Sequence, residues 1–146
     1  MRKAFILIGH SNWGKSKTLK SLIGSVRVTH WTIKGVDFFV RRISNDDDEE
    51  SLINFVDKRT VNKGNIIITF CPSFDKGKQV EAILKKLKKD FSLHFFVLKH
   101  KYRSDEIIPD TEVAVLKKYG SVYVYPKDTE AAERARAFKA FIADNL

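Results

Sequence analysis

Along this chain, short apolar runs alternate with segments in which apolar residues recur at helical spacing. The first kind of segment predicts strands and the second predicts helices. Residues 4–8 form a short apolar run typical of a buried strand, and residues 15–23 carry apolar side chains at helical spacing. Two runs rich in β-branched and aromatic residues, 26–33 and 36–43, flank the dipeptide Lys34-Gly35. This arrangement predicts a β-hairpin with Lys34-Gly35 at its tip.

An acidic segment, 44–50, precedes apolar residues at helical spacing and predicts a helix over 47–58, because Ser, Asn and acidic residues satisfy and complement a helix N-terminus. The same alternation continues to the end of the chain. It predicts strand 65–70, helix 78–89, strand 93–98, a short helix from Pro109 to about Tyr119, strand 121–125 and a final helix that includes Ala131 and Ile142.

Strands that alternate with helices predict an α/β fold with a mainly parallel sheet and helices on both faces. We therefore expect three layers, α/β/α, around a sheet of about six strands, with the hairpin as one antiparallel edge. In sheets of this kind the ligand lies at the carboxyl ends of the strands.

The segment after the first strand carries the most specific chemistry in the chain. It reads Gly-x-x-x-x-Gly-Lys-Ser and lies between a predicted strand and a predicted helix. Glycines let the backbone curve closely around an anion, and the N–H groups at a helix N-terminus attract phosphate oxygens. The predicted binding residues are Gly9, His10, Ser11, Asn12, Trp13, Gly14, Lys15, Ser16 and Lys17.

This motif, with its strand and helix, resembles the Walker A loop of the P-loop NTPase superfamily. The resemblance implies that residues 1–146 form a single nucleotide-binding domain for ATP or another nucleoside triphosphate. It also implies that Lys15 contacts the terminal phosphates and that Ser16 binds Mg²⁺. The element order is similar to that of Ras-type GTPases, but their Asp-x-x-Gly and Asn-Lys-x-Asp motifs are missing. A regulated GTPase is therefore disfavoured.

Two further residue types near predicted strand ends are candidates for the site. Asp46, or its neighbours Asp47 and Asp48, can complete a magnesium shell, although helix capping also accounts for all three. Arg41 and Arg42 follow each other on one strand, so at most one of them faces the phosphates. We take Lys15, Asp46 and Arg41 as the catalytic candidates, and Ser16 and Asp46 as the metal ligands.

The composition limits the partners and the location of the protein. The formal net charge is +9, with basic residues concentrated in 1–42 and 61–103, which favours anionic partners, nucleic acid among them. No apolar run is long enough for a signal peptide or a membrane span, and the sole cysteine, Cys71, forms no disulfide within the chain. We expect a protein of the cytoplasm that makes no contact with a membrane.

Three classes of function remain open. The first is a small ATPase or kinase-like phosphotransferase. The second is a nucleotide-dependent interaction module with weak or no hydrolysis, which acts through a protein partner or a second copy of the chain. The third is an accessory protein that binds nucleic acid through the lysine-rich helix 78–89 and the basic segment 99–103.

Overall fold

The computed structural model describes residues 2–24, 30–62, 64–76 and 78–146, and within them strands and helices alternate as the sequence predicts. The elements in chain order are β1 (Arg2–Ile8), α1 (Lys15–Ile23), β2 (His30–Ile33), β3 (Val36–Arg41), α2 (Glu49–Asn62), β4 (Asn65–Phe70), a short 3₁₀ helix (Phe74–Lys76), α3 (Lys78–Asp90), β5 (Phe91–Leu98), α4 (Asp110–Lys117), β6 (Ser121–Tyr125) and α5 (Ala131–Asp144).

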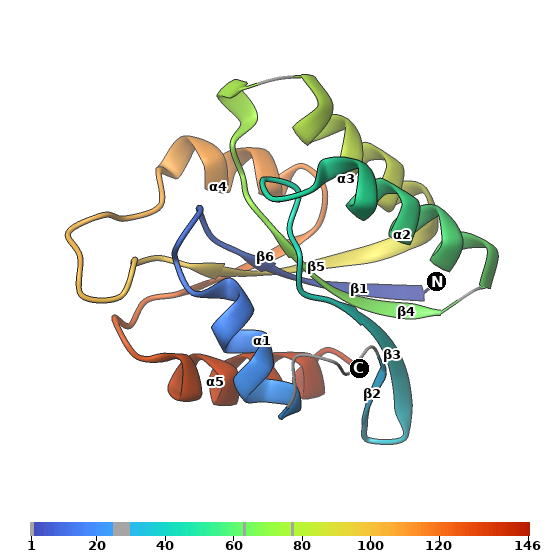
Figure 1. Ribbon diagram of the computed structural model, residues 1–146, viewed down its shortest axis with the longest axis horizontal. Coiled ribbons are helices and arrows are strands. Elements are labelled where there is room, and N and C mark those ends of the chain that lie inside the picture. The colour runs from blue at the N-terminus through green and yellow to red at the C-terminus, as the bar shows by residue number, and fades with distance from the viewer. Residues whose placement is uncertain (1, 25–29, 63, 77) are drawn as a thin grey trace.

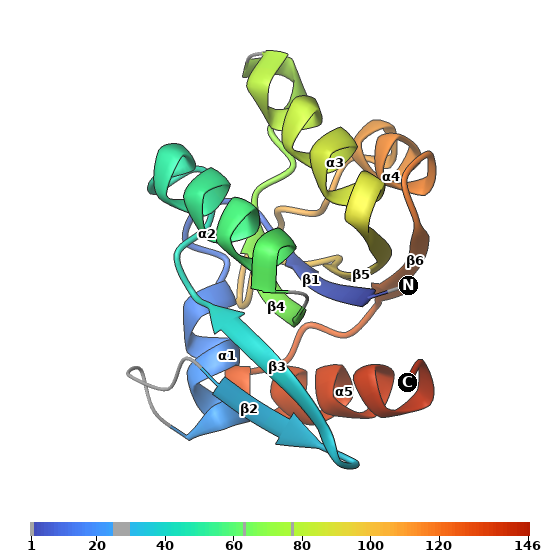
Figure 2. The same ribbon diagram turned by 90° about the vertical axis from the view of Figure 1, so that its right-hand side faces the viewer.

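In the described residues, six strands form one sheet in the order β2-β3-β4-β1-β5-β6. All neighbouring pairs are parallel except β2 and β3, which form the antiparallel hairpin at one edge. Helices α2, α3 and α4 cover one face of the sheet, and α1 and α5 cover the other (Figures 1 and 2). The predicted three-layer α/β architecture is therefore confirmed.

The core lies around the three central strands, β4, β1 and β5. The last five residues of β1 are fully buried, as expected for a parallel strand covered on both faces. Aromatic side chains fill the space between the sheet and α5: Phe5 meets Phe141 edge to face, and Phe96 contacts Phe138. None of the helices in the described residues is long and apolar enough to cross a membrane.

Several predicted boundaries agree with the structure and others shift. The hairpin turn is present, with Lys34 and Gly35 both at positive φ. Strand β2 is described from His30 on, and the earlier part of the predicted strand, residues 26–29, lies outside the described residues. Helix α2 begins at Glu49 instead of 47, because residues 45–47 form a turn and Asp48 accepts a hydrogen bond from the Ser51 backbone N–H.

Candidate functional site

The loop from Gly9 to Ser16, here called the Gly9–Ser16 loop, connects β1 to α1 at the carboxyl edge of the sheet. The Gly9 N–H donates to the Phe70 carbonyl at the end of β4 (3.2 Å), which holds the start of the loop against the neighbouring strand. Asn12 and Gly14 have φ values of 68° and 85°, so the backbone turns twice through the left-handed region before α1 begins. The loop therefore curves around its own backbone N–H groups at the helix N-terminus.

Lys15 is a buried ammonium group within this loop. Its side chain is largely covered, and Nζ donates to the Gly9 carbonyl (2.6 Å) and to the His10 carbonyl (3.0 Å). Burial lowers the pKa of Lys15, and the nearby charges of Asp46 and Asp47 oppose that shift. Among the described residues no carboxylate lies within ion-pair distance of Nζ. A buried cation with only carbonyl partners favours an anionic ligand.

A pocket of about 400 Å³ lies over the second half of the loop. It is lined by Ser11, Asn12, Trp13, Gly14, Lys15, Ser16, Lys17, Arg42, Asp46 and Asp47. Of the nine residues predicted to bind nucleotide, seven line this pocket. Gly9 is buried beside the Lys15 side chain and does not line this pocket, and His10 lines a different pocket.

The structure places Arg41 and Arg42 in different surroundings. Arg42 lines the pocket and its Nη1 lies 3.4 Å from Ser16 Oγ, whereas Arg41 donates to the Ser51 hydroxyl on α2. Adjacent residues at a strand end point to opposite faces, and α2 covers the face that receives Arg41. Arg41 therefore lies away from the loop, and Arg42 is the guanidinium beside it.

Asp46 lines the same pocket as Ser16, the other predicted metal ligand. Its carboxylate accepts a hydrogen bond from the Ser44 hydroxyl. Among the described residues no group of three or more His, Cys, Asp or Glu side chains is placed to hold a metal. Mg²⁺ bound with a nucleotide needs only one or two protein oxygens, because phosphates and waters supply the others. Ser16 and Asp46 fit that requirement.

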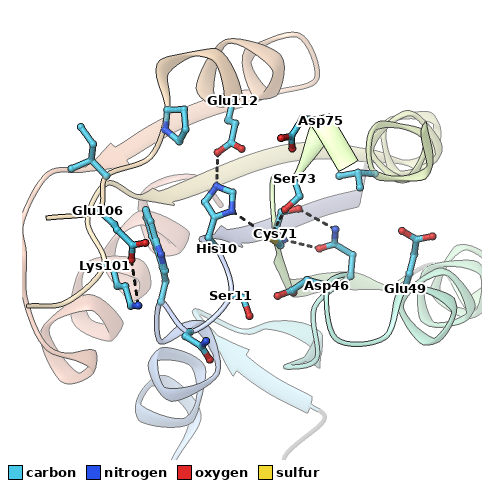
Figure 3. Close-up of a pocket in the computed structure, with 16 residues that line it drawn as sticks. His10, Ser11, Asp46, Glu49, Cys71, Ser73, Asp75, Lys101, Glu106 and Glu112 are labelled. Atoms are coloured by element: carbon cyan, nitrogen blue, oxygen red, sulfur yellow. Dashed lines mark hydrogen bonds and ion pairs between the residues drawn. The ribbon is translucent and has the colours of Figure 1, made fainter. Parts of the chain in front are cut away.

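A second, larger pocket of about 920 Å³ adjoins the first (Figure 3). The two pockets share Ser11, Asn12, Trp13 and Asp46. Carboxylates dominate the charged lining of the larger one: Asp46, Glu49, Asp75, Glu106 and Glu112, against Lys101 and His10. One pocket thus presents cations around the loop, and its neighbour presents mostly anions.

Sequence reasoning missed the row of side chains that the Gly9–Ser16 loop, the segment after β4 and the first turn of α4 bring together. His10 Nε2 lies 2.5 Å from Glu112 Oε1, and His10 Nδ1 lies 3.6 Å from Cys71 Sγ. Cys71 Sγ also lies 3.0 Å from Ser73 Oγ. Glu112 stands 102 positions from His10 in the chain, so no local pattern pairs them.

Arg134 on α5 was also missed. It is 2% exposed, and its guanidinium donates to the Trp13 carbonyl (2.6 Å) and to the His100 carbonyl (2.9 Å). It thereby joins the Gly9–Ser16 loop to the segment after β5. The only sequence signal was an arginine near the apolar stripe of the final helix, which is ambiguous, because such a side chain can also extend into solvent.

The predicted nucleic-acid surface on α3 is exposed but partly engaged. Lys85, Lys86, Lys88 and Lys89 are all exposed, yet Lys86 pairs with Asp57 (2.5 Å) and Lys88 donates to the Lys118 carbonyl. Nucleic-acid binding stays a prediction.

Comparison with known proteins provides little further information. No protein-family model matches the chain, and no curated protein matches it. A crystal structure of a gluconokinase from Sinorhizobium meliloti 1021 aligns with 100% of this chain and 97% of that one, at 13% identity and a TM-score of 0.42. A likeness at this level does not assign a family or an activity.

Proposed function

We propose that residues 1–146 form one nucleotide-binding domain that holds a nucleoside triphosphate, with ATP as the first candidate, in the Gly9–Ser16 loop. The observation that carries the proposal is Lys15, a buried ammonium held by two loop carbonyls at the N-terminus of α1 with no carboxylate partner in the described residues. Transfer of a cation into such a site is costly unless an anion compensates it. Phosphate oxygens supply that compensation.

The residues around the loop suit the phosphates of a nucleotide. Beyond Gly9, backbone N–H groups of the Gly9–Ser16 loop and of the start of α1 bind the bridging oxygens, except the Trp13 N–H, which donates to the His10 carbonyl. Lys15 and Arg42 neutralise charge that grows on the terminal phosphoryl group. Ser16 and Asp46 hold Mg²⁺. When bound, the ion draws negative charge from the phosphate oxygens and aligns them.

The larger pocket favours phosphoryl transfer over simple hydrolysis. It adjoins the loop through Ser11, Asn12, Trp13 and Asp46, and its volume of about 920 Å³ suits a small-molecule substrate. We therefore assign it to the acceptor. Its carboxylates can accept hydrogen bonds from a hydroxyl or amine group of that acceptor.

The test of binding is a thermal-shift and calorimetric titration with ATP, GTP and pyrophosphate in the presence of Mg²⁺. Ligand that binds only the native state stabilises it by about 2.7 kcal/mol at a hundredfold excess over Kd. We expect the Lys15→Met variant to lose this shift. The matched control is Lys20→Met, which removes an exposed lysine from the same helix. No shift with any triphosphate refutes the proposal.

A second measurement separates catalysis from binding. Formation of ADP and of a phosphorylated acceptor that depends on an added polyol or amine, and that is lost in Arg42→Gln and Asp46→Asn, supports a phosphotransferase. Phosphate release without an acceptor supports an ATPase. Tight binding without turnover under either condition supports the nucleotide-dependent interaction module.

A further inference from the structure

Three elements bring a thiol, an imidazole and a carboxylate into one line beside the larger pocket. His10 comes from the Gly9–Ser16 loop, Cys71 follows β4, and Glu112 lies in the first turn of α4. Figure 3 shows His10 between the other two, with its two ring nitrogens directed towards them. Neither phosphate binding nor magnesium binding, as proposed above, uses Cys71 or Glu112.

This order of groups is the one that activates a nucleophile. A weak nucleophile becomes reactive when a base lies within hydrogen-bond reach and a third group orients the base. Here the imidazole faces the sulfur at 3.6 Å, a hydrogen-bond contact for sulfur, and the carboxylate holds the opposite nitrogen at 2.5 Å. The Ser73 hydroxyl, 3.0 Å from the sulfur, gives the thiolate a second hydrogen-bond partner.

We propose that Cys71 is an activated thiol, with His10 as its base and Glu112 as the positioning residue, and that small hydroperoxides oxidise it to a sulfenic acid. The geometry favours a small reactant, because Cys71 is 2% exposed and lines the larger pocket. Hydrogen peroxide is small enough to approach the sulfur through that pocket.

The reaction balances with the groups present. The Cys71 thiolate attacks one peroxide oxygen, an S–O bond forms, and the O–O bond breaks. The leaving hydroxide takes the proton of the His10 imidazolium and departs as water. Sulfur is oxidised by two electrons and the peroxide is reduced by two. Because Cys71 is the only cysteine in the chain, the sulfenic acid has no intramolecular thiol with which to condense.

The charges around the thiol agree with this chemistry. The pKa of His10 is raised to about 9 by its hydrogen bond to Cys71, against the effect of burial, with further support from Glu112. Burial raises the pKa of Cys71, but hydrogen bonds from His10 and Ser73 and the charge of Lys15 outweigh it, so the pKa lies below its ordinary value despite the opposing charge of Asp46.

Glu112 completes the electrostatic surroundings of His10. Burial raises the pKa of Glu112 and the charge of Asp75 adds to that effect, whereas His10 opposes both. The imidazole therefore lies between a thiolate and a carboxylate that both favour its protonated form.

The test follows sulfenic acid formation with dilute hydrogen peroxide, by trapping with dimedone and mass spectrometry, from pH 5.5 to 10 and without nucleotide. An unfolded thiol is only about 1% thiolate at pH 6.5. We expect the native protein at pH 6.5 to react at least tenfold faster than the same chain unfolded in urea, and this advantage to disappear above pH 9.5. Native reactivity equal to or below that of the unfolded chain at pH 6.5 overturns the proposal.

Variants of His10 and Glu112 separate activation of the Cys71 thiol from access of peroxide to it. His10→Gln and Glu112→Gln should both slow the reaction at pH 6.5, His10→Gln by tenfold or more, while neither changes the rate near pH 10, where the thiol is ionised without help. His94→Gln is the matched control, because His94 is a partly buried histidine whose hydrogen-bond partners are Ser92 and Ser121. Equal rates in wild type and both test variants at pH 6.5 refute the roles of His10 and Glu112. Since no nucleotide is present, these results do not depend on the proposed function.

Discussion

Replacement of Arg134 by methionine should lower the free energy of unfolding, because two hydrogen bonds of its buried guanidinium are lost. The guanidinium is fully buried and donates to the carbonyls of Trp13 and His100, on the segments that follow β1 and β5. Methionine fills a similar volume without any donor. Both carbonyls then lose a partner in the interior, where an unsatisfied polar group is costly.

The magnitude follows from two opposing effects. Each hydrogen bond from a charged donor contributes about 1.5–3 kcal/mol, so the two together contribute about 3–6 kcal/mol. Removal of a buried cation also removes its desolvation penalty, which offsets part of that loss, as in other buried charges. We expect a net decrease of about 2–4 kcal/mol in the free energy of unfolding.

Urea denaturation followed by circular dichroism measures this change. With an m-value of about 2 kcal/mol/M, the middle of the usual range for small proteins, the midpoint should fall by about 1–2 M. Arg136→Met is the matched control, because Arg136 lies on the same helix with a side chain that is 73% exposed and a long contact to Glu133. We expect that variant to stay within about 0.5 kcal/mol of the wild type. Equal stabilities of the two variants refute the assigned role of Arg134.

Three further outcomes are expected. Gly120→Ala should destabilise by about 3 kcal/mol or more in urea titrations, because its Cβ would lie 2.3 Å from the Leu93 carbonyl oxygen, and near-wild-type stability contradicts this. Gly24→Ala, where φ is 82° and nothing lies within 4 Å, should lose only about 1 kcal/mol from backbone strain, and a larger loss contradicts the open surroundings. The pKa of His10 is raised to about 9 in the folded protein. The contribution of protonated His10 to the free energy of unfolding is therefore fully present below about pH 6.5 and is lost as the pH rises through 9. The difference in unfolding free energy between wild type and His10→Asn should therefore shrink from pH 6.5 to 9.5, and a constant difference argues against a protonated His10.

Local signals in the sequence identified most of the elements. Helix α1 spans Lys15–Ile23 as predicted, because apolar spacing and a glycine that adopts positive φ mark its length and its end. The hairpin turn at Lys34-Gly35 and strand β6 also agree with prediction. The start of helix α2 was predicted two residues too early, because acidic residues occur both in turns and in the first turn of a helix. Only the hydrogen bond from the Ser51 N–H to Asp48 shows where the helix begins.

The sequence by itself determined the alternation of strands and helices and the position of the Gly9–Ser16 loop, since both depend on spacings of a few residues. Only the tertiary structure decided which side chains face that loop. The order of the strands places β1 between β4 and β5, so the ends of three strands meet and bring Cys71 to His10. Helix α5 packs beside α1, and this places Arg134 against the Trp13 carbonyl, 121 positions away in the chain (Figure 1). Such contacts depend on topology and the layers of the fold, and no local pattern of residues encodes them.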